Sequence, residues 1–577
     1  MDYSQYFNTK ETSQSKQIPG SNQIENSAGG FVWAVDDWKR LDRFLILGTE
    51  GGSYYASEKA LTIESADVVL RCLKADGLRT VARIVKISVA GRAPKNDQAL
   101  FALALATSFG NLETRQAAFA AVNDVARMGT YFFTFLKNAG ANRGWGRAMK
   151  RAGASWYTSK TAENLAYQIL KYRQRDGWSH RDVLRLAHPV APTPEHEALF
   201  RWTVENTAMG ERDVARQEKK NGPRITKHYP AVDETLLPKI VTDFERLQKA
   251  ENAAAVAGIL GQNKDLTWEM VPKEFTGDVK VWEPLLPNMK PTALIRNLAR
   301  LTANGLLGPM NNATRLAAAK ITDAEGLKKE RVHPIAILGA LATYCLGRGV
   351  KGNLVWNPVS KIIDALDEAF YLSFGNVVPS GKRTLLCLDI SGSMETGQIA
   401  GMPGLTPRVA SVAMALVSAK VEKHFAIVGF TAASCHPRCA GGRWCYGYSC
   451  GGRGHRCEPS ITQLNISPRQ RMDDVIEKMK QLPMGGTDCS LPMRWALANN
   501  VEADAFVVYT DNETWHGDIH PLQALQEYRR KTGIPAKLVV VGMVANEFSI
   551  ADPNDAGMMD VVGFDTAAPN LISDFIS

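Results

Sequence analysis

The sequence lacks any apolar run long enough to cross a membrane. A spanning helix needs about 18–20 consecutive apolar residues, and the longest candidate, residues 334–347, is shorter and interrupted by glycine. The first residues, MDYSQYFNTKETSQSKQ, are polar where a secretory signal would be apolar. We therefore expect a cytoplasmic protein without a membrane segment.

Catalytic signatures are also missing. The chain contains no Walker A phosphate loop, no HExxH motif and no GxSxG motif. Its carboxylates are too sparse at any one place for a two-metal nuclease. Cysteine is scarce, with nine residues among 577, and in a reducing compartment we expect free thiols or metal ligands instead of a disulfide framework. We expect a protein that is not an enzyme.

The chain does contain two stretches of different construction, as expected beyond the roughly 250–300 residues that one core supports. Residues 1–30 are polar and indicate a tail or an extended strap. Residues 31–375 show helical periodicity almost throughout, which predicts a stacked solenoid of helix pairs. Residues 381–577 alternate short apolar runs with amphipathic helices, which predicts a doubly wound α/β unit with a parallel sheet.

The individual elements can be placed from the same patterns. The helices expected in the first stretch lie at 97–108, 114–126, 162–172, 194–205, 235–255, 291–302 and 361–372. The strands expected in the second lie at 384–390, 425–430, 505–510, 538–543 and 561–564, with helices at 407–422, 469–481, 490–500 and 520–532. Functional residues of such a sheet belong at the carboxyl ends of its strands.

Positive charge is concentrated in the helical stretch. Residues 1–380 hold 50 Lys and Arg against 39 Asp and Glu, whereas residues 381–577 hold 18 against 20. Within 137–188, 11 basic residues, among them Arg147 and Lys150, stand against three acidic ones. Such a local excess is typical of a protein that binds a polyanion, although a solvated helical surface has the same composition.

A corner between two expected helices gathers Lys, Arg and His. Lys171 and Arg175 are four residues apart, so both are expected on one face of the same helix. Ser179 and Asp182 have the capping-box spacing for the next helix, which should end at His188. The Lys, Arg and His side chains of this corner are candidates to bind phosphates of an exposed strand. For His188 alone, a structural role is the alternative.

Three loops that follow apolar runs or precede helices carry oxygen ligands. Asp389, Ser391 and Ser393 form a DxSxS triplet after the first strand, Thr487 follows a glycine pair, and Asp511 follows the strand at 505–510. Together they can surround one divalent cation, and oxygen-only ligation favours Mg²⁺, with Mn²⁺ or Ca²⁺ as alternatives. Without a metal, the two carboxylates would cap helices and turns. The set resembles the metal-ion-dependent adhesion site of von Willebrand factor A domains, which usually bind rather than catalyse.

The run KYRQRDGWSHRDVLRLAH at 171–188 resembles the signature of the Ro autoantigen family, whose RNA-binding module is called TROVE. Further stretches agree in order: RLDRFLILGTEGGSYY, GWGRAMKRA, IRNLARLTANGLL, GKRTLLCLDISGSM, GGTDCSLPM and YTDNETW. The matches span roughly residues 25–545, nearly the whole chain. The chain is therefore identified as a member of that family.

The resemblance implies a ring of HEAT-like helical repeats closed by the von Willebrand factor A domain. It implies that single-stranded 3′ ends of misfolded structured RNAs enter a central hole, and that small noncoding Y RNAs bind the outer basic surface. Some bacterial members recruit polynucleotide phosphorylase through a Y RNA, so an exoribonuclease is an implied partner. The positions that match RNA contacts of the family are Lys171, Arg175 and His188, with Arg173, His180 and Arg181 expected on the same surface.

Residues 435–457, CHPRCAGGRWCYGYSCGGRGHRC, depart from the family pattern. Their five cysteines and two histidines could hold Zn²⁺, but no CxxC knuckle is present, and a basic loop with reduced thiols is the alternative. Taken together, the sequence indicates an RNA-binding protein of noncoding-RNA quality control. The rival interpretation is a protein–protein scaffold whose A-type domain binds an acidic ligand through its metal.

Overall fold

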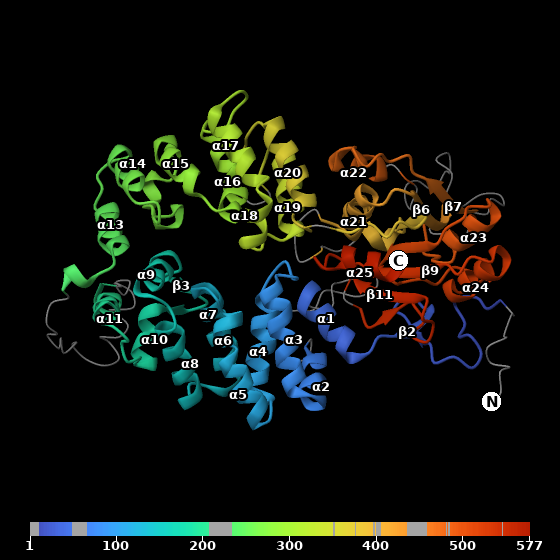
Figure 1. Cartoon of the computed structure of the whole chain (residues 1–577), viewed down its shortest axis with the longest axis horizontal. Coiled ribbons are helices and arrows are strands. Elements are labelled where there is room, and N and C mark those ends of the chain that lie inside the picture. The colour runs from blue at the N-terminus through green and yellow to red at the C-terminus, as the bar shows by residue number, and fades with distance from the viewer. Residues whose placement is uncertain are drawn as a thin grey trace.

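In the computed structural model, the described residues are 11–48, 66–206, 233–349, 352–375, 377–395, 399, 405–434, 458–480, 482, 485–544 and 546–577. They form a helical part and an α/β part, so the predicted fold class is confirmed. Figure 1 shows the helices leaving the α/β part along one side and returning along the other. Both ends of the helical part therefore lie beside the sheet.

The outgoing arm is a row of helices, coloured blue to teal in Figure 1. It comprises α1 (Asp37–Leu47), α2 (Asp67–Ala75), α3 (Gly77–Ala90), α4 (Asp97–Phe109), α5 (Leu112–Ala120), α6 (Val122–Val125), α7 (Gly129–Arg143), α8 (Arg147–Thr158), α9 (Ala162–Lys171), α10 (His180–Ala187) and α11 (Pro194–Asn206). Helix α4 is its centre, since every side chain from Ala99 to Thr107 is buried. A helix that is apolar all round is stable only when neighbours cover it, and α1, α2, α3, α5 and α7 do so here.

The returning arm runs from green to yellow in Figure 1. It comprises η2 (Glu234–Leu236), α13 (Lys239–Gln248), α14 (Ala253–Gln262), η3 (Trp268–Met270), η4 (Lys273–Phe275), α15 (Val279–Leu285), η5 (Leu286–Asn288), α16 (Pro291–Ala303), α17 (Asn312–Ile321), α18 (Ala324–Lys329), α19 (Pro334–Cys345) and α20 (Ser360–Leu372). The single helix predicted at 235–255 is wrong. The chain breaks there because Pro238 stands before α13 and Asn252 caps α14 by accepting from the Ala255 N–H.

The two arms touch both far from the sheet and near it. Far from the sheet, α9 packs against α13 and η3. Near the sheet, Arg331 Nε donates to the Val89 carbonyl at 2.8 Å, and His333 Nε2 lies 3.1 Å from the Arg92 carbonyl oxygen. The space between the arms is therefore bounded at both ends by contacts within one chain.

The α/β part is built on a six-stranded sheet of order β11-β9-β8-β5-β6-β7, parallel throughout except for the edge strand β7. Its strands are β5 (Thr384–Asp389), β6 (Phe425–Ser434), β7 (Glu458–Gln463), β8 (Ala505–Thr510), β9 (Lys537–Gly542) and β11 (Met558–Val562). Its helices are η6 (Gly392–Glu395), α21 (Pro407–Val421), α22 (Met472–Lys480), α23 (Leu491–Ala498), α24 (Pro521–Thr532) and α25 (Ala568–Ile576). The chain passes from β5 out to β7 and returns to β8 on the other side of β5, which makes their carboxyl ends the topological switch point.

The N-terminal segment forms a strap against the α/β part. Strand β2 (Phe31–Ala34) pairs with β1 (Ile24–Glu25) on one side and β10 (Phe548–Ser549) on the other. Residues 31–34, which the sequence assigned to the helical stretch, thus pair with the α/β part. The approach is close, because a Cβ on Gly30 would clash with the Thr514 carbonyl oxygen.

Candidate nucleic-acid interface and metal centre

The basic corner is a helix, a hairpin and a second helix. Helix α9 ends at Lys171, and Arg175 lies on the first strand of the hairpin. Asp176 and Gly177 have φ of +53° and +80°, as a tight turn between antiparallel strands requires. The prediction that Lys171 and Arg175 share one helix face is therefore wrong. The hairpin strands are β3 (Gln174–Arg175) and β4 (Trp178–Ser179).

Helix α10 begins and ends as the sequence predicts. Ser179 accepts from the Asp182 N–H, and the Asp182 carboxylate accepts from the Ser179 N–H, which completes a capping box. The C-cap is His188, whose φ of +45° stops the helix. Its exposed side chain lies at the end of the helix, directly before Pro189.

Most of the predicted RNA-contacting residues are exposed. Arg175 keeps 56% of its side chain exposed and lies 3.8 Å from Asp176. Arg173 places its guanidinium 5.4 Å from the ring centre of Phe244 on α13, so it reaches toward the returning arm. The exposed members of the predicted set are Arg147, Lys150, Arg173, Arg175 and His188.

His180 and Arg181 are buried, so the prediction that they lie on the exposed surface is wrong. His180 is 1% exposed; its ring packs on Phe133 and Trp156, and its Nδ1 lies 2.8 Å from the Tyr157 hydroxyl. Burial lowers the pKa of His180 to about 3, which keeps the ring neutral. The signal was in the sequence, because position 180 shares the apolar face of α10 with 183, 184 and 187.

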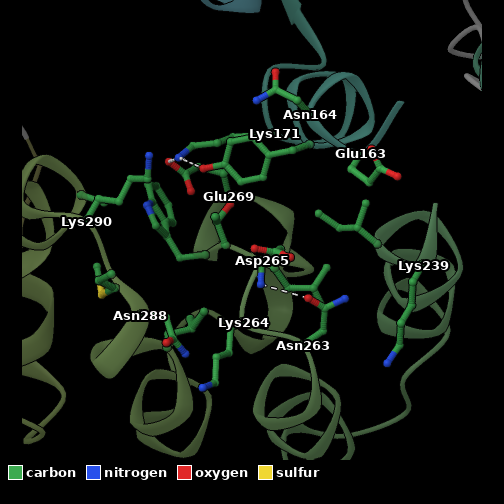
Figure 2. A pocket seen from close by; sticks show the side chains of 18 of the residues that line it. Glu163, Asn164, Lys171, Lys239, Asn263, Lys264, Asp265, Glu269, Asn288 and Lys290 are labelled. Carbon is green, nitrogen blue, oxygen red and sulfur yellow. Dashed lines mark hydrogen bonds and ion pairs between the residues drawn. The ribbon is translucent and has the colours of Figure 1, made fainter. Parts of the chain in front are cut away.

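Lys171 lies in a cavity between the two arms, which we call the inter-arm cavity. Only 9% of its side chain is exposed, and its Nζ lies 3.7 Å from Glu269 and 3.0 Å from the Tyr167 hydroxyl. Figure 2 shows Lys171 reaching from α9 toward Glu269 on the opposite wall. The cavity has a volume of about 840 Å³ and is lined by both arms. Its charged residues are Glu163, Lys171, Lys239, Lys264, Asp265, Glu269 and Lys290.

The predicted metal ligands meet at the switch point of the sheet. Asp389 ends β5, and its carboxylate accepts from the Ser391 N–H at 2.9 Å and from the Thr510 hydroxyl at 2.7 Å. The hydroxyl oxygens of Ser391 and Ser393 are 3.0 Å apart. Asp511 follows β8 directly. All five predicted ligands, including Thr487, are buried.

Asp511 gives the strongest structural indication of a cation. Its Oδ2 is buried and has no hydrogen-bond partner, whereas its Oδ1 accepts from the Glu513 N–H at 3.0 Å. Burial, followed by the negative charge of Asp389, raises the pKa of Asp511 well above its ordinary value. The described residues contain no group of three or more His, Cys, Asp or Glu able to hold a metal. Two carboxylates with hydroxyl donors nevertheless fit a hard cation such as Mg²⁺.

The three loops that carry the candidate metal ligands, which we call the metal loops, are joined by contacts that the sequence did not predict. Gly392 N donates to the Gly485 carbonyl at 3.1 Å, which joins the first loop to the second. The Thr487 carbonyl accepts from the N–H groups of Trp515 and His516 at 3.2 and 3.1 Å, which joins the second loop to the third. Buried Arg408 donates to the Ile390 carbonyl and pairs with Glu395 at 3.0 Å. Its signal was a charge in the first turn of α21, directly before a long apolar run.

The strap contacts the same loops from the other side. Gln14 Nε2 donates to buried Asp488 at 2.7 Å, and Asn26 Nδ2 donates to the Thr514 carbonyl at 2.8 Å. The Ala28 N–H donates to Glu513 at 3.2 Å. No local sequence pattern predicts these contacts, because the partners are more than 470 residues apart.

Comparison with known families agrees with this architecture. A model of the TROVE domain matches residues 24–343, more than half of the chain, and a model of the Ro60 vWA domain matches residues 452–576. The chain belongs to the Ro60 family. The predicted resemblance is confirmed, and the α/β part is the vWA domain of this family. Thr487 and Asp511 lie within the matched vWA range, whereas Asp389, Ser391 and Ser393 precede it.

Ro60 relatives cover almost all of the chain. The RNA-binding protein RO60 of Deinococcus radiodurans is 38% identical over 555 residues, covering 96% of this chain and 95% of that protein. The RNA-binding protein RO60 of Caenorhabditis elegans is 34% identical, with 96% and 90% covered. The crystal structure of the Deinococcus radiodurans RO (RSR) protein matches with a TM-score of 0.65 and 37% identity, covering 94% of this chain and 99% of that one. The names of both relatives describe RNA-binding proteins.

One expectation falls outside the described structure, and another can be compared with it. The insert 435–457, with its candidate Zn²⁺ ligands, lies outside the described residues. Within the described ranges, no helix combines the length and apolar character needed to cross a bilayer.

Proposed function

We propose that this protein binds RNA through the basic corner formed by α9, the hairpin and α10. The observation that carries the proposal is the exposure of Arg173, Arg175 and His188 at that corner, next to Lys171 in the inter-arm cavity. Contacts from Lys and Arg to phosphates provide affinity without sequence preference. The names of the Ro60 relatives support the same ligand.

Joint substitution of Lys171 and Arg175 by alanine tests the proposal. Affinity for single-stranded RNA should fall roughly 10- to 100-fold near 0.1 M salt, because two phosphate contacts are lost. The matched control replaces Arg530 and Lys531, exposed on α24, and removes the same charge from the α/β part. Binding is measured by fluorescence anisotropy. Equal affinities for the two double variants would overturn the site assignment.

The family resemblance supports a finer proposal. We propose that a Y-like noncoding RNA binds the outer basic surface, including Arg147 and Lys150, and that single-stranded 3′ ends of misfolded RNA enter between the two arms. The contacts that join the arms at both ends are compatible with a strand held between them. In this proposal the protein acts in the cytoplasm in noncoding-RNA quality control and passes RNA to an exoribonuclease such as polynucleotide phosphorylase.

A second candidate function rests on the metal loops. We propose that Asp389, Ser391, Ser393, Thr487 and Asp511 hold Mg²⁺, and that the vWA domain uses it to bind an acidic group of a protein partner. The buried Asp511 Oδ2 without a hydrogen-bond partner favours this proposal. When bound, the ion would supply an electrophilic site for a carboxylate. The five side chains would hold that ion at the switch point of the sheet.

Thermal unfolding with and without Mg²⁺ tests the metal proposal. A cation that binds only the folded protein raises the melting temperature in proportion to the logarithm of its concentration. We expect Mg²⁺ to stabilise the native protein and to have no effect on Asp389→Ala, with RNA binding unchanged in that variant. An equal Mg²⁺ effect on both proteins would contradict the assignment.

A further inference from the structure

Lys171 is paired within the protein before any RNA is present. Its Nζ lies 3.7 Å from the Glu269 carboxylate on η3, and Lys171 is 9% exposed while Glu269 is 27% exposed. The pair crosses from the outgoing arm to the returning arm, since Lys171 ends α9. A carboxylate in this position occupies the place that an RNA phosphate would take beside the ammonium group.

The surrounding cavity has room and charge for a strand. Its volume of about 840 Å³ lies between α9 and the returning arm, where η3, η5 and α16 contribute lining residues. Lys290 is paired with Glu330 at 3.0 Å. Lys239 and Lys264 line the cavity and make no ion pair with any residue that the structure describes. The cavity therefore offers a phosphate two lysines that no described carboxylate pairs with, in addition to Lys171.

We propose that Glu269 is a specificity-determining residue for RNA: it competes with phosphate for Lys171, and a bound strand displaces it. The inference rests on the proposed RNA-binding function and names the residue within the protein that opposes it. Ligands that offer less negative charge than a phosphate chain cannot take Lys171 from Glu269. The ion pair thus selects for polyanions entering the inter-arm cavity.

Three variants distinguish the release of Lys171 from a general change of charge. Glu269→Gln removes the competing carboxylate at nearly constant shape, whereas Glu163→Gln removes the same charge from the α9 wall of the cavity, where Glu163 makes no ion pair with a described residue. Glu269→Asp keeps the charge and withdraws the carboxylate by one methylene. All three are compared with the native full-length chain.

Affinity for a labelled single-stranded RNA oligonucleotide of mixed sequence is measured at low salt. Breaking a partly exposed ion pair should tighten binding about two- to five-fold in Glu269→Gln, with a smaller gain in Glu269→Asp and little change in Glu163→Gln. In a Lys171→Ala background, Glu269→Gln should have no effect. Melting curves confirm that each variant is folded.

Several results would overturn the inference. Equal gains in Glu269→Gln and Glu163→Gln would indicate general electrostatics, as would a gain that persists without Lys171. Unchanged or weaker binding in both Glu269 variants would show that the carboxylate does not compete. Failure of the native protein to bind RNA would instead reject the proposed function itself, and with it this inference.

Discussion

In this protein, burial decides more than residue type does which side chains are charged and which can contact a ligand. Two basic residues four positions apart, Lys171 and Arg175, lie in different environments: one is 9% exposed in the inter-arm cavity and the other 56% exposed on a hairpin. His180 belongs to the same sequence signature and is buried among aromatic rings. Arg175 is therefore open to direct contact with RNA, whereas His180 could reach RNA only through a rearrangement of the core.

The pKa of His180 predicts a pH dependence of stability. Its folded-state pKa of about 3 lies below its ordinary value of 6.5, so the unfolded chain takes up a proton first as the pH falls. The stabilisation is therefore complete above pH 6.5 and is lost as the pH falls toward 3, with about 2 kcal/mol lost by pH 5. His333, whose pKa burial lowers to about 4, acts with the same sign.

Urea unfolding at pH 7 and pH 5 measures this loss in the native protein and in His180→Asn. The asparagine oxygen can replace Nδ1 as acceptor for Tyr157, whose hydroxyl lies 2.8 Å from that nitrogen. The variant should lose about 2 kcal/mol less than the native protein over this interval. An identical pH dependence in both proteins would show that His180 is not buried and neutral in solution.

Elements far apart in the sequence are joined by hydrogen bonds to buried polar groups. The strap is the clearest example: Gln14 donates to Asp488 at 2.7 Å and to the Ile519 carbonyl at 2.8 Å. Burial raises the pKa of the Asp488 carboxyl, and hydrogen bonds from Ser490 and Gln14 oppose that rise. The strap therefore supports the second metal loop, which carries Thr487 beside Asp488.

Removing Gln14 should destabilise the vWA domain. Gln14→Ala leaves Asp488 with one donor fewer in a buried site, at a cost of about 1–3 kcal/mol. Gln17→Ala, an exposed position of the same strap that bonds within the strap alone, should change stability by no more than about 0.5 kcal/mol. Equal melting temperatures of the two variants would mean that the strap does not hold these loops.

The local sequence pattern predicted the helices and strands better than it predicted which residues contact each other across the fold. The strand at 505–510 was placed correctly because a strand buried on both faces is continuously apolar. The hairpin at 174–179 was missed because the helical pattern of α9 continues into it, and only the two positive φ values reveal the turn. The five candidate metal ligands lie at neighbouring strand ends, as expected, because sheet topology fixes where strand ends meet. No such rule predicts the pairing of Glu269 with Lys171, because the two residues lie nearly 100 positions apart in the sequence.

The whole molecule is a helical part whose two ends are fastened to one sheet. Arg43 on α1 pairs with Asp560 on β11 at 2.7 Å, with side chains 2% and 6% exposed. Arg92, after α3, pairs with Asp565, and Arg471, before α22, pairs with Asp364 on α20. These pairs hold the outgoing and returning arms against the vWA domain, as Figure 1 shows for the arrangement of the elements.

Breaking the buried pair should loosen the whole assembly. Arg43→Met leaves Asp560 buried without its cationic partner, which should cost about 3–5 kcal/mol. Arg201→Met removes an exposed partner of Glu197 on α11 and should cost at most about 1 kcal/mol. Calorimetry of both variants measures the difference in stability. Comparable unfolding temperatures would show that Arg43 does not hold the helical part against the sheet.

RNA binding by the whole chain can be tested through the nucleic acid that the purified protein retains. The native protein is purified at low salt. One portion of the retained nucleic acid is treated with ribonuclease, and another portion is sequenced. We predict an absorbance ratio well above that of protein alone, removed by ribonuclease, with a small structured RNA or fragments with free 3′ ends enriched. If the protein is free of RNA after purification at low salt and also fails to bind added single-stranded RNA, this chain is not an RNA-binding protein.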